Sequence, residues 1–290
     1  MYGESGAEEP LPAPSFGGGE SLRTKLSYHL EGLVPVILII IIGVFVLWRF
    51  GVINTATPIL GPSLAAVLGS EQPARLLVIG QPSPETIAVL NDPANKDIVQ
   101  VTYRSVESLE RNPKDQLAPY RILMLDQSSQ ADKLVSRQLG EAIKNFVKTG
   151  GRLIIVGNSG IRRPEDSSVL GWQATFGDIV PVDCEVQVGK LEEPSCVQQF
   201  AVRGKLYRLD YKHPILEGIP QLPVEPGTLT FETYNVTVAG KELAYLESEP
   251  GRQYYTAIVE KPLITGKSIY FNYNPGSTPV VFINTLKYLR

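Results

Sequence analysis

A run of seventeen residues without a charge, residues 32–48, constrains this chain of 290 residues more than any other feature. As a helix the run spans about 25 Å, slightly less than a bilayer core, and the apolar residues among 50–53 can extend it. Trp48 and the long side chain of Arg49 suit the membrane interface. The run therefore predicts a retained transmembrane helix over residues 32–53.

A buried core helix and a cleaved signal peptide both fit the run less well. A buried core helix would be shorter or would show a polar stripe, and this run has no polar face. A cleaved signal peptide would have a shorter apolar core followed by small residues, whereas residues 47–50 are bulky and about thirty residues precede the run.

The placement of Lys and Arg predicts the orientation. Arg23 and Lys25 precede the run, and after Arg49 no cation follows until Arg75. Because cytoplasmic flanks carry the excess of Lys and Arg, the N-terminus is expected in the cytoplasm and the C-terminal part outside the cell membrane. The expected partners are accordingly the lipid bilayer and a membrane or surface protein.

Composition divides the remainder of the chain. Residues 1–31, with much Gly, Pro, Glu and Ser, are expected to form a disordered cytoplasmic tail. Residues 54–74 follow as a linker or stalk, uncharged as far as Ser70. This segment is either a stalk that touches a partner or an ordinary linker packed on the domain. Residues 75–290 are enough for one well-cored domain.

The net charge and the small number of histidines and cysteines argue against nucleic-acid binding and against zinc binding. The net charge of −3, with mixed signs, provides no electrostatic footprint for nucleic acid. Two histidines and two cysteines make a zinc site improbable, since structural zinc takes four such ligands. No cofactor and no metal are expected.

The two cysteines and a sequon fit an extracytoplasmic domain. Cys184 and Cys196 flank an alternating stretch and a turn-like stretch, which favours a hairpin closed by a disulfide; two unrelated buried thiols are the alternative. Asn235 begins an Asn-Val-Thr triplet, a glycosylation acceptor of a kind that also arises by chance.

The first part of the domain alternates strands with helices. A helix is expected over residues 131–148, with Ser128 or Ser129 as its N-cap, because its apolar residues share one face. Gly150 and Gly151 end it. Short apolar runs separated by helices are typical of βαβ units and a mostly parallel sheet. The expected strands are residues 75–80, 97–103, 120–126 and 152–157.

The second part of the domain is strand-rich and closes with a helix over residues 279–289. It is either a β insertion or part of the main sheet, because strand order cannot be read from one sequence. The predicted fold class is thus α/β: an N-terminal transmembrane helix plus a flavodoxin-like, mostly parallel sheet with a strand-rich second half. Strands are expected near residues 179–188, 196–203, 228–238, 243–247, 253–260 and 267–272.

Four stretches, residues 120–126, 142–157, 213–220 and 266–276, together resemble the class I glutamine amidotransferase-like fold in its ThuA-like, non-amidotransferase branches. The most recognisable stretch is a helix followed by Phe146-Val147, two glycines and an apolar strand. The resemblance covers residues 75–290 and implies an amidotransferase-like α/β domain. Membrane-anchored domains of this kind also occur in gliding-type transport accessory proteins.

Catalytic members of that fold carry a Cys nucleophile on a tight turn after a central strand. Here the turn is Gly157-Asn158-Ser159-Gly160, and both cysteines lie downstream. The domain is therefore expected not to be an enzyme, with no catalytic residues.

Candidate ligand-binding residues follow two of the predicted strands. Asp126 stands at a strand end where α/β sheets bind ligands, although such an Asp also caps helices. The Gly157–Gly160 turn could hold an anion with its N–H groups. A Ser159–His213 pair is the catalytic alternative, against a surface His213 that caps local backbone.

The leading hypothesis is a non-catalytic, membrane-anchored domain that binds a partner or ligand at the cell surface. One alternative is an accessory subunit of a membrane transporter or surface assembly. The other is a hydrolase that uses Ser159 or Asp126.

Overall fold

The structure is a computed structural model that describes residues 35–36, 38–43, 72–166, 168–184 and 196–290. The chain divides into two units, Met1–Ser70 and Glu71–Arg290. Residues 1–31, and all but the last three residues of the segment 54–74, lie outside the described residues, so the predictions of a tail and a stalk are not tested.

The predicted transmembrane helix is not supported. Among the described residues, no helix has the length and apolar character needed to cross a membrane. The prediction of a cell-membrane location, which depended on this helix, is corrected with it.

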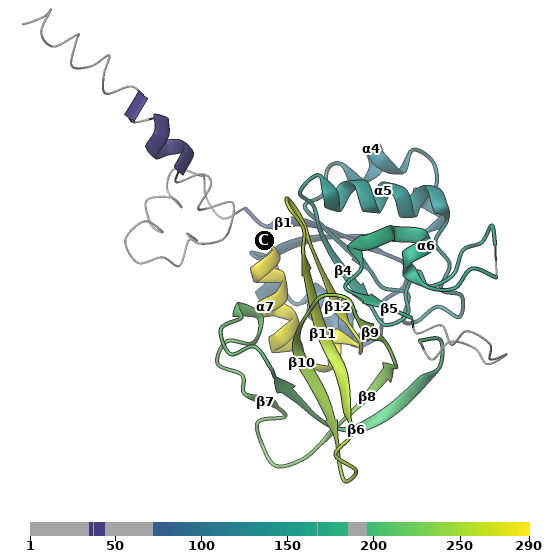
Figure 1. The fold of residues 1–290 in the computed structure, drawn as a ribbon, viewed down its shortest axis with the longest axis vertical. Helices are drawn as coiled ribbons and strands as arrows, with labels where there is room; N and C mark the ends of the chain where they lie inside the picture. Colours follow the sequence, from purple (N-terminus) through teal and green to yellow (C-terminus); the bar gives the residue numbers. More distant parts are fainter. Residues whose placement is uncertain (1–34, 37, 44–71, 167, 185–195) are drawn as a thin grey trace, which may run out of the picture. The chain divides into compact units, whose positions relative to one another are not determined.

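A ten-stranded mixed sheet organises the second unit (Figure 1). The strand order is β2-β1-β3-β4-β12-β11-β10-β6-β7, and β8 pairs with β6 beside β7. The strands are β1 (Ala74–Ile79), β2 (Val99–Arg104), β3 (Ile122–Leu125), β4 (Arg152–Val156), β6 (Gln199–Arg208), β7 (Gln221–Leu222), β8 (Leu229–Tyr234), β10 (Lys241–Ser248), β11 (Tyr254–Pro262) and β12 (Lys267–Phe271).

Five of these strands, β2, β1, β3, β4 and β12, are parallel. The three central ones are apolar runs because helices cover both faces of this half of the sheet. Apolar side chains of α3 and α7 join the core on one face, and those of α5 and α6 join the core on the other. The helices are α3 (Pro84–Asn91), α4 (Pro113–Leu117), α5 (Arg137–Lys148), α6 (Trp172–Phe176) and α7 (Pro279–Leu289).

The strand-rich second half continues the same sheet in antiparallel order. Strand β11 pairs antiparallel with β12, and β10, β6, β7 and β8 follow with antiparallel pairing. The prediction of a mostly parallel sheet is therefore wrong, because half of the strands pair antiparallel.

The remaining elements are short. A separate two-stranded sheet joins β5 (Val182–Asp183) to β9 (Thr237–Val238). The 3-10 turns are η1 (Pro93–Asn95), η2 (Glu107–Leu109), η3 (Gly177–Ile179), η4 (Pro214–Leu216) and η5 (Pro275–Ser277).

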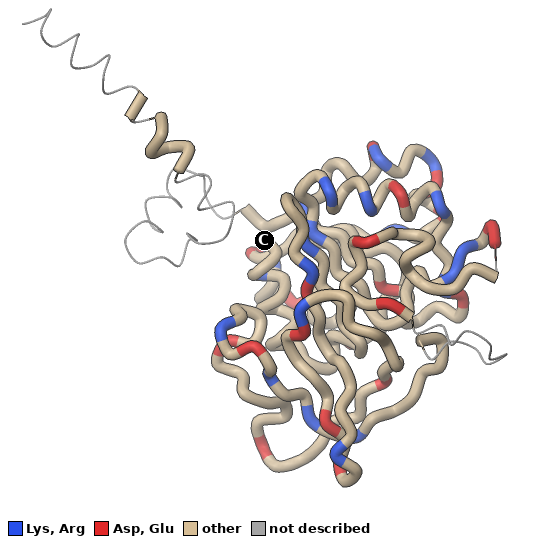
Figure 2. The backbone as a smooth tube through the Cα atoms, viewed as in Figure 1, with Lys and Arg blue, Asp and Glu red and all other residues tan. Residues whose placement is uncertain are grey.

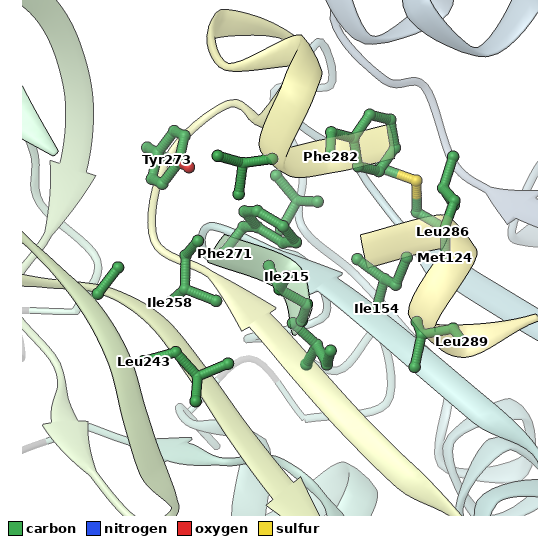
Figure 3. Close-up of a cluster of buried hydrophobic side chains, with 14 of the residues drawn as sticks. Met124, Ile154, Ile215, Leu243, Ile258, Phe271, Tyr273, Phe282, Leu286 and Leu289 are labelled. Atoms are coloured by element: carbon green, nitrogen blue, oxygen red, sulfur yellow. The ribbon is translucent and has the colours of Figure 1, made fainter. Parts of the chain in front are cut away.

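The core under α7 ties the two halves of the sheet together. Figure 3 shows Phe282, Leu286 and Leu289 of α7 beside Phe271 of β12 and Met124 of β3. Ile258 of β11 and Leu243 of β10 belong to the same fully buried cluster. The parallel and antiparallel strands therefore share one hydrophobic core.

Helix α5 begins later than the apolar pattern predicted. Its N-cap is Ser136, whose hydroxyl accepts the N–H of Leu139 at 3.3 Å. The preceding residues are not helical, because Leu134 forms a bridge to Arg162 and the ammonium of Lys133 binds the carbonyl oxygens of residues 127, 128 and 130. Ser128 and Ser129 are therefore not helix caps.

Candidate functional site

The carboxyl ends of four parallel strands bring polar residues to one edge of the sheet. The chain leaves β1 at Gly80, β3 at Asp126, β4 at Gly157 and β12 at Asn272. The register aligns Leu125 of β3 with Ile155 of β4, so Asp126 and the turn that follows β4 lie on neighbouring strands. Ligands of open α/β sheets bind at this edge, and it contains every ligand-binding residue predicted from the sequence.

Asp126 is completely buried, and one of its carboxylate oxygens has no partner. Its Oδ1 accepts the backbone N–H of Ser128 at 2.9 Å, which makes a turn rather than a helix cap. Within the part of the chain that the structure describes, its Oδ2 makes no hydrogen bond. Burial raises the pKa of Asp126 from 3.8 to about 6, although the hydrogen bonds from Ser128 and the charge of Lys133 oppose this.

Ser159 is held in a network that leaves its hydroxyl without a base. Its Oγ accepts the backbone N–H of Gln127 at 2.8 Å, and its carbonyl accepts the indole N–H of Trp172 at 2.9 Å. The Gln127 side chain accepts the N–H of Gly160 at 2.8 Å. Among the described residues no histidine or carboxylate bonds to Ser159, so these contacts fix the shape of the turn.

Tyr234, at the end of β8, covers the Gly157 turn. The space that a Cβ of Gly157 would occupy lies 2.9 Å from the edge of the Tyr234 ring. Burial, with smaller contributions from the charges of Glu232 and Asp126, raises the pKa of Tyr234 to about 12. Asn272 holds this tyrosine in place: its amide accepts the backbone N–H of Tyr234 at 3.2 Å and donates to its carbonyl at 2.7 Å.

Gly157→Ala is expected to lower the free energy of unfolding by about 2 kcal/mol and to displace the Tyr234 ring. Residue 157 has φ = +53°, where an L side chain costs about 1–2 kcal/mol, and the new methyl group would meet the ring. Urea unfolding measures the loss, with Gly218→Ala as control. Residue 218 has φ = +73° and open space around it, so a difference of zero between the two variants would argue against the Tyr234 contact.

Asn158 adds a side-chain amide to the turn after β4. Asn158 is 9% exposed, and its backbone carbonyl accepts the N–H of Ile161 at 3.2 Å. The described hydrogen bonds of Tyr234 involve only its backbone. A carboxylic acid, an amide and a phenol thus lie around Gly157, and the carboxylic acid is closed off from solvent.

His213 lies in another part of the domain and not at this edge. It is buried, its Nδ1 accepts the N–H of Ile215 at 3.4 Å, and its Nε2 lies 3.1 Å from Glu260. The predicted backbone capping is present, but the residue is not on the surface. Because this ring is bonded to Glu260, the structure does not bring Ser159 and His213 together.

Sequence reasoning missed Tyr234 and Asn272. Asn272 carried a usable signal, since a polar residue directly after the apolar run of β12 marks the ligand-binding edge. Tyr234 carried none, because nothing in the sequence pairs the end of β8 with the turn after β4.

The remaining predicted sites have separate places in the fold. Cys184 and Cys196 form a disulfide with Cα atoms 5.4 Å apart. Asn235 is exposed, so its glycosylation stays a prediction. The described residues contain no group of three or more His, Cys, Asp or Glu that could hold a metal ion. The predicted bilayer and protein partners are not tested.

Comparison with known proteins finds no matching family model and no matching curated protein. Three similar solved structures are a β-galactosidase from Bacillus circulans sp. alkalophilus, a protein from Thermoplasma acidophilum named for a GMP synthase, and the carbohydrate deacetylase Agd3. Their identities are 14%, 11% and 13%, and their TM-scores are 0.46, 0.40 and 0.42. Each match covers 76% of this chain, and 32%, 96% and 33% of the respective structures. The chain thus spans about a third of the galactosidase and of the deacetylase.

These comparisons correct three predictions. Membership of a class I glutamine amidotransferase-like family is not upheld, because no family model matches and the similar structures include glycoside hydrolases and a carbohydrate deacetylase. The expectation of a non-catalytic domain, and with it that of a binding function alone, is corrected: the similar structures carry the names of enzymes, namely β-galactosidases and a carbohydrate deacetylase. At such low similarity none of them identifies an activity for this chain.

Proposed function

We propose that this chain is a hydrolase in which Asp126 acts as the general acid–base. The observation that carries the proposal is the state of this carboxyl group: it is fully buried, its Oδ2 has no partner in the described structure, and its pKa is about 6. A catalytic acid–base works best when its pKa lies near the working pH, and strongly perturbed carboxyl groups concentrate at functional sites.

The reaction follows from the ionised carboxylate. Asp126 removes a proton from water while the water oxygen bonds to the electrophilic carbon of the substrate. The proton then passes from Asp126 to the leaving group as its bond to that carbon breaks. The side-chain amide of Asn158 donates a hydrogen bond to the oxygen on which negative charge develops.

Asp126 fits this role better than Ser159, the other candidate nucleophile or base. The Ser159 hydroxyl already accepts the N–H of Gln127, and no described histidine or carboxylate can take its proton. Ser159 therefore holds the turn in shape, and attack by water needs no covalent intermediate on the protein.

A substrate reaches Asp126 only when the covering segment moves. Asp126 and Ser159 are at most 1% exposed, and the Tyr234 ring lies over the Gly157 turn. Motion of covering loops that exclude water during the reaction is common in enzymes. Tyr234, at the end of β8, is the side chain that must turn away.

The test is hydrolysis of a panel of aryl esters, aryl glycosides and acetylated sugars by the full chain. We expect Asp126→Asn to lower kcat/KM by about 10²- to 10⁴-fold, as loss of a general acid–base does. Since the base must be ionised, wild-type activity should fall as the pH drops through about 6. Asp132→Asn, an exposed aspartate six residues further on, is the control for an unchanged rate.

The Ser159→Ala variant distinguishes general acid–base catalysis by Asp126 from catalysis by Ser159. It should retain most of the activity and lose about 1–2 kcal/mol of stability, because the buried N–H of Gln127 loses its acceptor. Activity abolished by Ser159→Ala, or unaffected by Asp126→Asn, would overturn the assignment of Asp126. Absence of turnover across the whole panel would overturn the proposal of a hydrolase.

A further inference from the structure

Six residues on β6, β10 and β11 form a regular array on one face of the antiparallel half of the sheet. Tyr245 lies opposite Tyr207 on one side and Thr256 on the other, and Glu247 lies opposite Lys205 and Tyr254. Side chains two residues apart along a strand share a face, so both rows point the same way. We call this array the tyrosine face, and in Figure 1 its three strands run side by side.

The tyrosine face is not covered by the hydrophobic cores. None of its six residues belongs to either core, whereas Leu206 and Leu246, which point to the opposite face, are fully buried against α7 and its neighbours. Tyr254 is 65% exposed, and Tyr207 and Tyr245 are partly exposed. The described residues therefore leave three tyrosine rings at the surface of a rigid sheet.

The three rings contact one another. Tyr207 and Tyr245 are stacked with centroids 5.5 Å apart, and Tyr245 and Tyr254 meet edge to face at 5.4 Å. These contacts hold the rings in place before any ligand binds, which lowers the entropy cost of binding.

We propose that the tyrosine face binds an uncharged glycan chain, a function beyond and independent of the hydrolytic site at Asp126. The negative faces of aromatic rings attract the weakly positive C–H groups of a sugar ring, and tyrosine hydroxyls can hydrogen-bond to its hydroxyl groups. Lys205, Glu247 and Thr256 lie among the rings and supply further donors and acceptors for hydroxyl groups.

Charge complementarity favours a neutral ligand over a polyanion. Lys205 lies opposite Glu247 and pairs with Glu249 at 3.6 Å, and beyond the array Lys241 pairs with Asp210. Figure 2 shows Lys and Arg interspersed with Asp and Glu over these strands. With cations already balanced by carboxylates, this surface offers no net attraction to phosphate or sulfate chains.

The same charges argue against a protein partner. The buried centre of a protein interface is depleted in Lys and Glu, because removing their charges from water is costly. Here Lys205 and Glu247 stand between the tyrosines. A hydrated glycan, whose hydroxyl groups can replace water around both charges, avoids that cost.

Calorimetric titration of the full chain with cellohexaose, xylohexaose, mannohexaose and chitohexaose tests the proposal. We expect at least one of them to bind, and Tyr254→Ala and Tyr245→Ala each to weaken that binding about tenfold. Tyr103→Ala is the matched control, since this tyrosine is 38% exposed but lies on β2 at the far edge of the sheet. Asp126→Asn should bind like the wild type, which separates this surface from the hydrolytic site.

Three results would overturn the proposal. The first is that no hexasaccharide binds, and the second is that binding survives both tyrosine substitutions. The third is self-association in sedimentation experiments that Tyr254→Ala abolishes, since it would assign the face to a second copy of the chain. Thermal melting checks that both variants fold, which their partial exposure favours.

Discussion

Replacing Asp126 with asparagine is expected to make the protein progressively more stable, relative to the wild type, as the pH rises to about 8, and to lower kcat/KM by about 10²- to 10⁴-fold. The folded-state pKa of Asp126 is about 6, above the ordinary value of 3.8. Between these values the folded protein binds a proton that the unfolded chain has lost, so stability falls as the pH rises through about 6. The difference between the pKa values of 3.8 and about 6 corresponds to about 3 kcal/mol of stability that the wild type loses as the pH rises. The asparagine variant does not lose it, because its side chain is neutral at every pH.

The measurement is urea unfolding of the wild type and of Asp126→Asn between about pH 4 and pH 8. The stability of the variant relative to the wild type should increase by about 3 kcal/mol across this range. The change with pH is the decisive quantity, since an asparagine N–H₂ without an acceptor adds a constant cost at every pH. A stability difference between the two proteins that does not change with pH would show that Asp126 is not a buried group of raised pKa.

Replacing Glu260 with alanine is expected to lower the free energy of unfolding by about 3–5 kcal/mol. This carboxylate is 5% exposed and accepts hydrogen bonds from the hydroxyl of Tyr288 at 2.7 Å and from His213 at 3.1 Å. Since Nδ1 of His213 accepts the N–H of Ile215, the proton is on Nε2, which donates to Glu260. Glu260 thereby joins β11 to η4 and to α7, and its loss also leaves Lys267 without its carboxylate at 3.9 Å.

The contribution of Glu260 to the stability of the folded protein should rise with pH, whereas that of Asp126 should fall. Burial acts to raise the pKa of Glu260, but the hydrogen bonds from His213 and Tyr288 outweigh it and hold the pKa below 4.5. Its stabilising contribution is therefore complete above pH 4.5 and is lost as the pH falls through the folded-state pKa. Urea unfolding at about pH 7 measures the loss.

Glu232→Ala, at an exposed position on β8, should change stability by no more than about 0.5 kcal/mol. Glu260→Gln, which keeps an acceptor for Tyr288, should cost less than Glu260→Ala. A Glu260→Ala variant as stable as Glu232→Ala would contradict a structural role for this cluster.

Local patterns identified the strands and helices of the parallel half. Uninterrupted apolar runs such as residues 153–156 are buried on both faces, and this burial is what their composition reflects. The same reasoning placed the start of α5 too early. Its apolar periodicity extends before Ser136, but side-chain and bridge contacts of Lys133 and Leu134 hold the chain out of the helix.

Pairing between distant segments was beyond the sequence. Alternating residues identify a strand without naming its neighbour, so the antiparallel continuation from β12 through β11 to β6 appeared only in the structure. The burial of His213 shows the same limit. His-Pro suggested a surface turn, yet this turn packs on α7 and its histidine meets a carboxylate 47 residues away.

The sequence by itself determined that this is an α/β chain and that Asp126 and the Gly157–Gly160 turn each follow the end of a strand, because hydrophobic periodicity and turn residues act locally. The tertiary structure alone decided the electrostatic state of Asp126, the placement of Tyr234 over Gly157 and the tyrosine face. Each of these depends on which distant segments exclude water from a side chain, and burial by distant segments leaves no local pattern in the sequence.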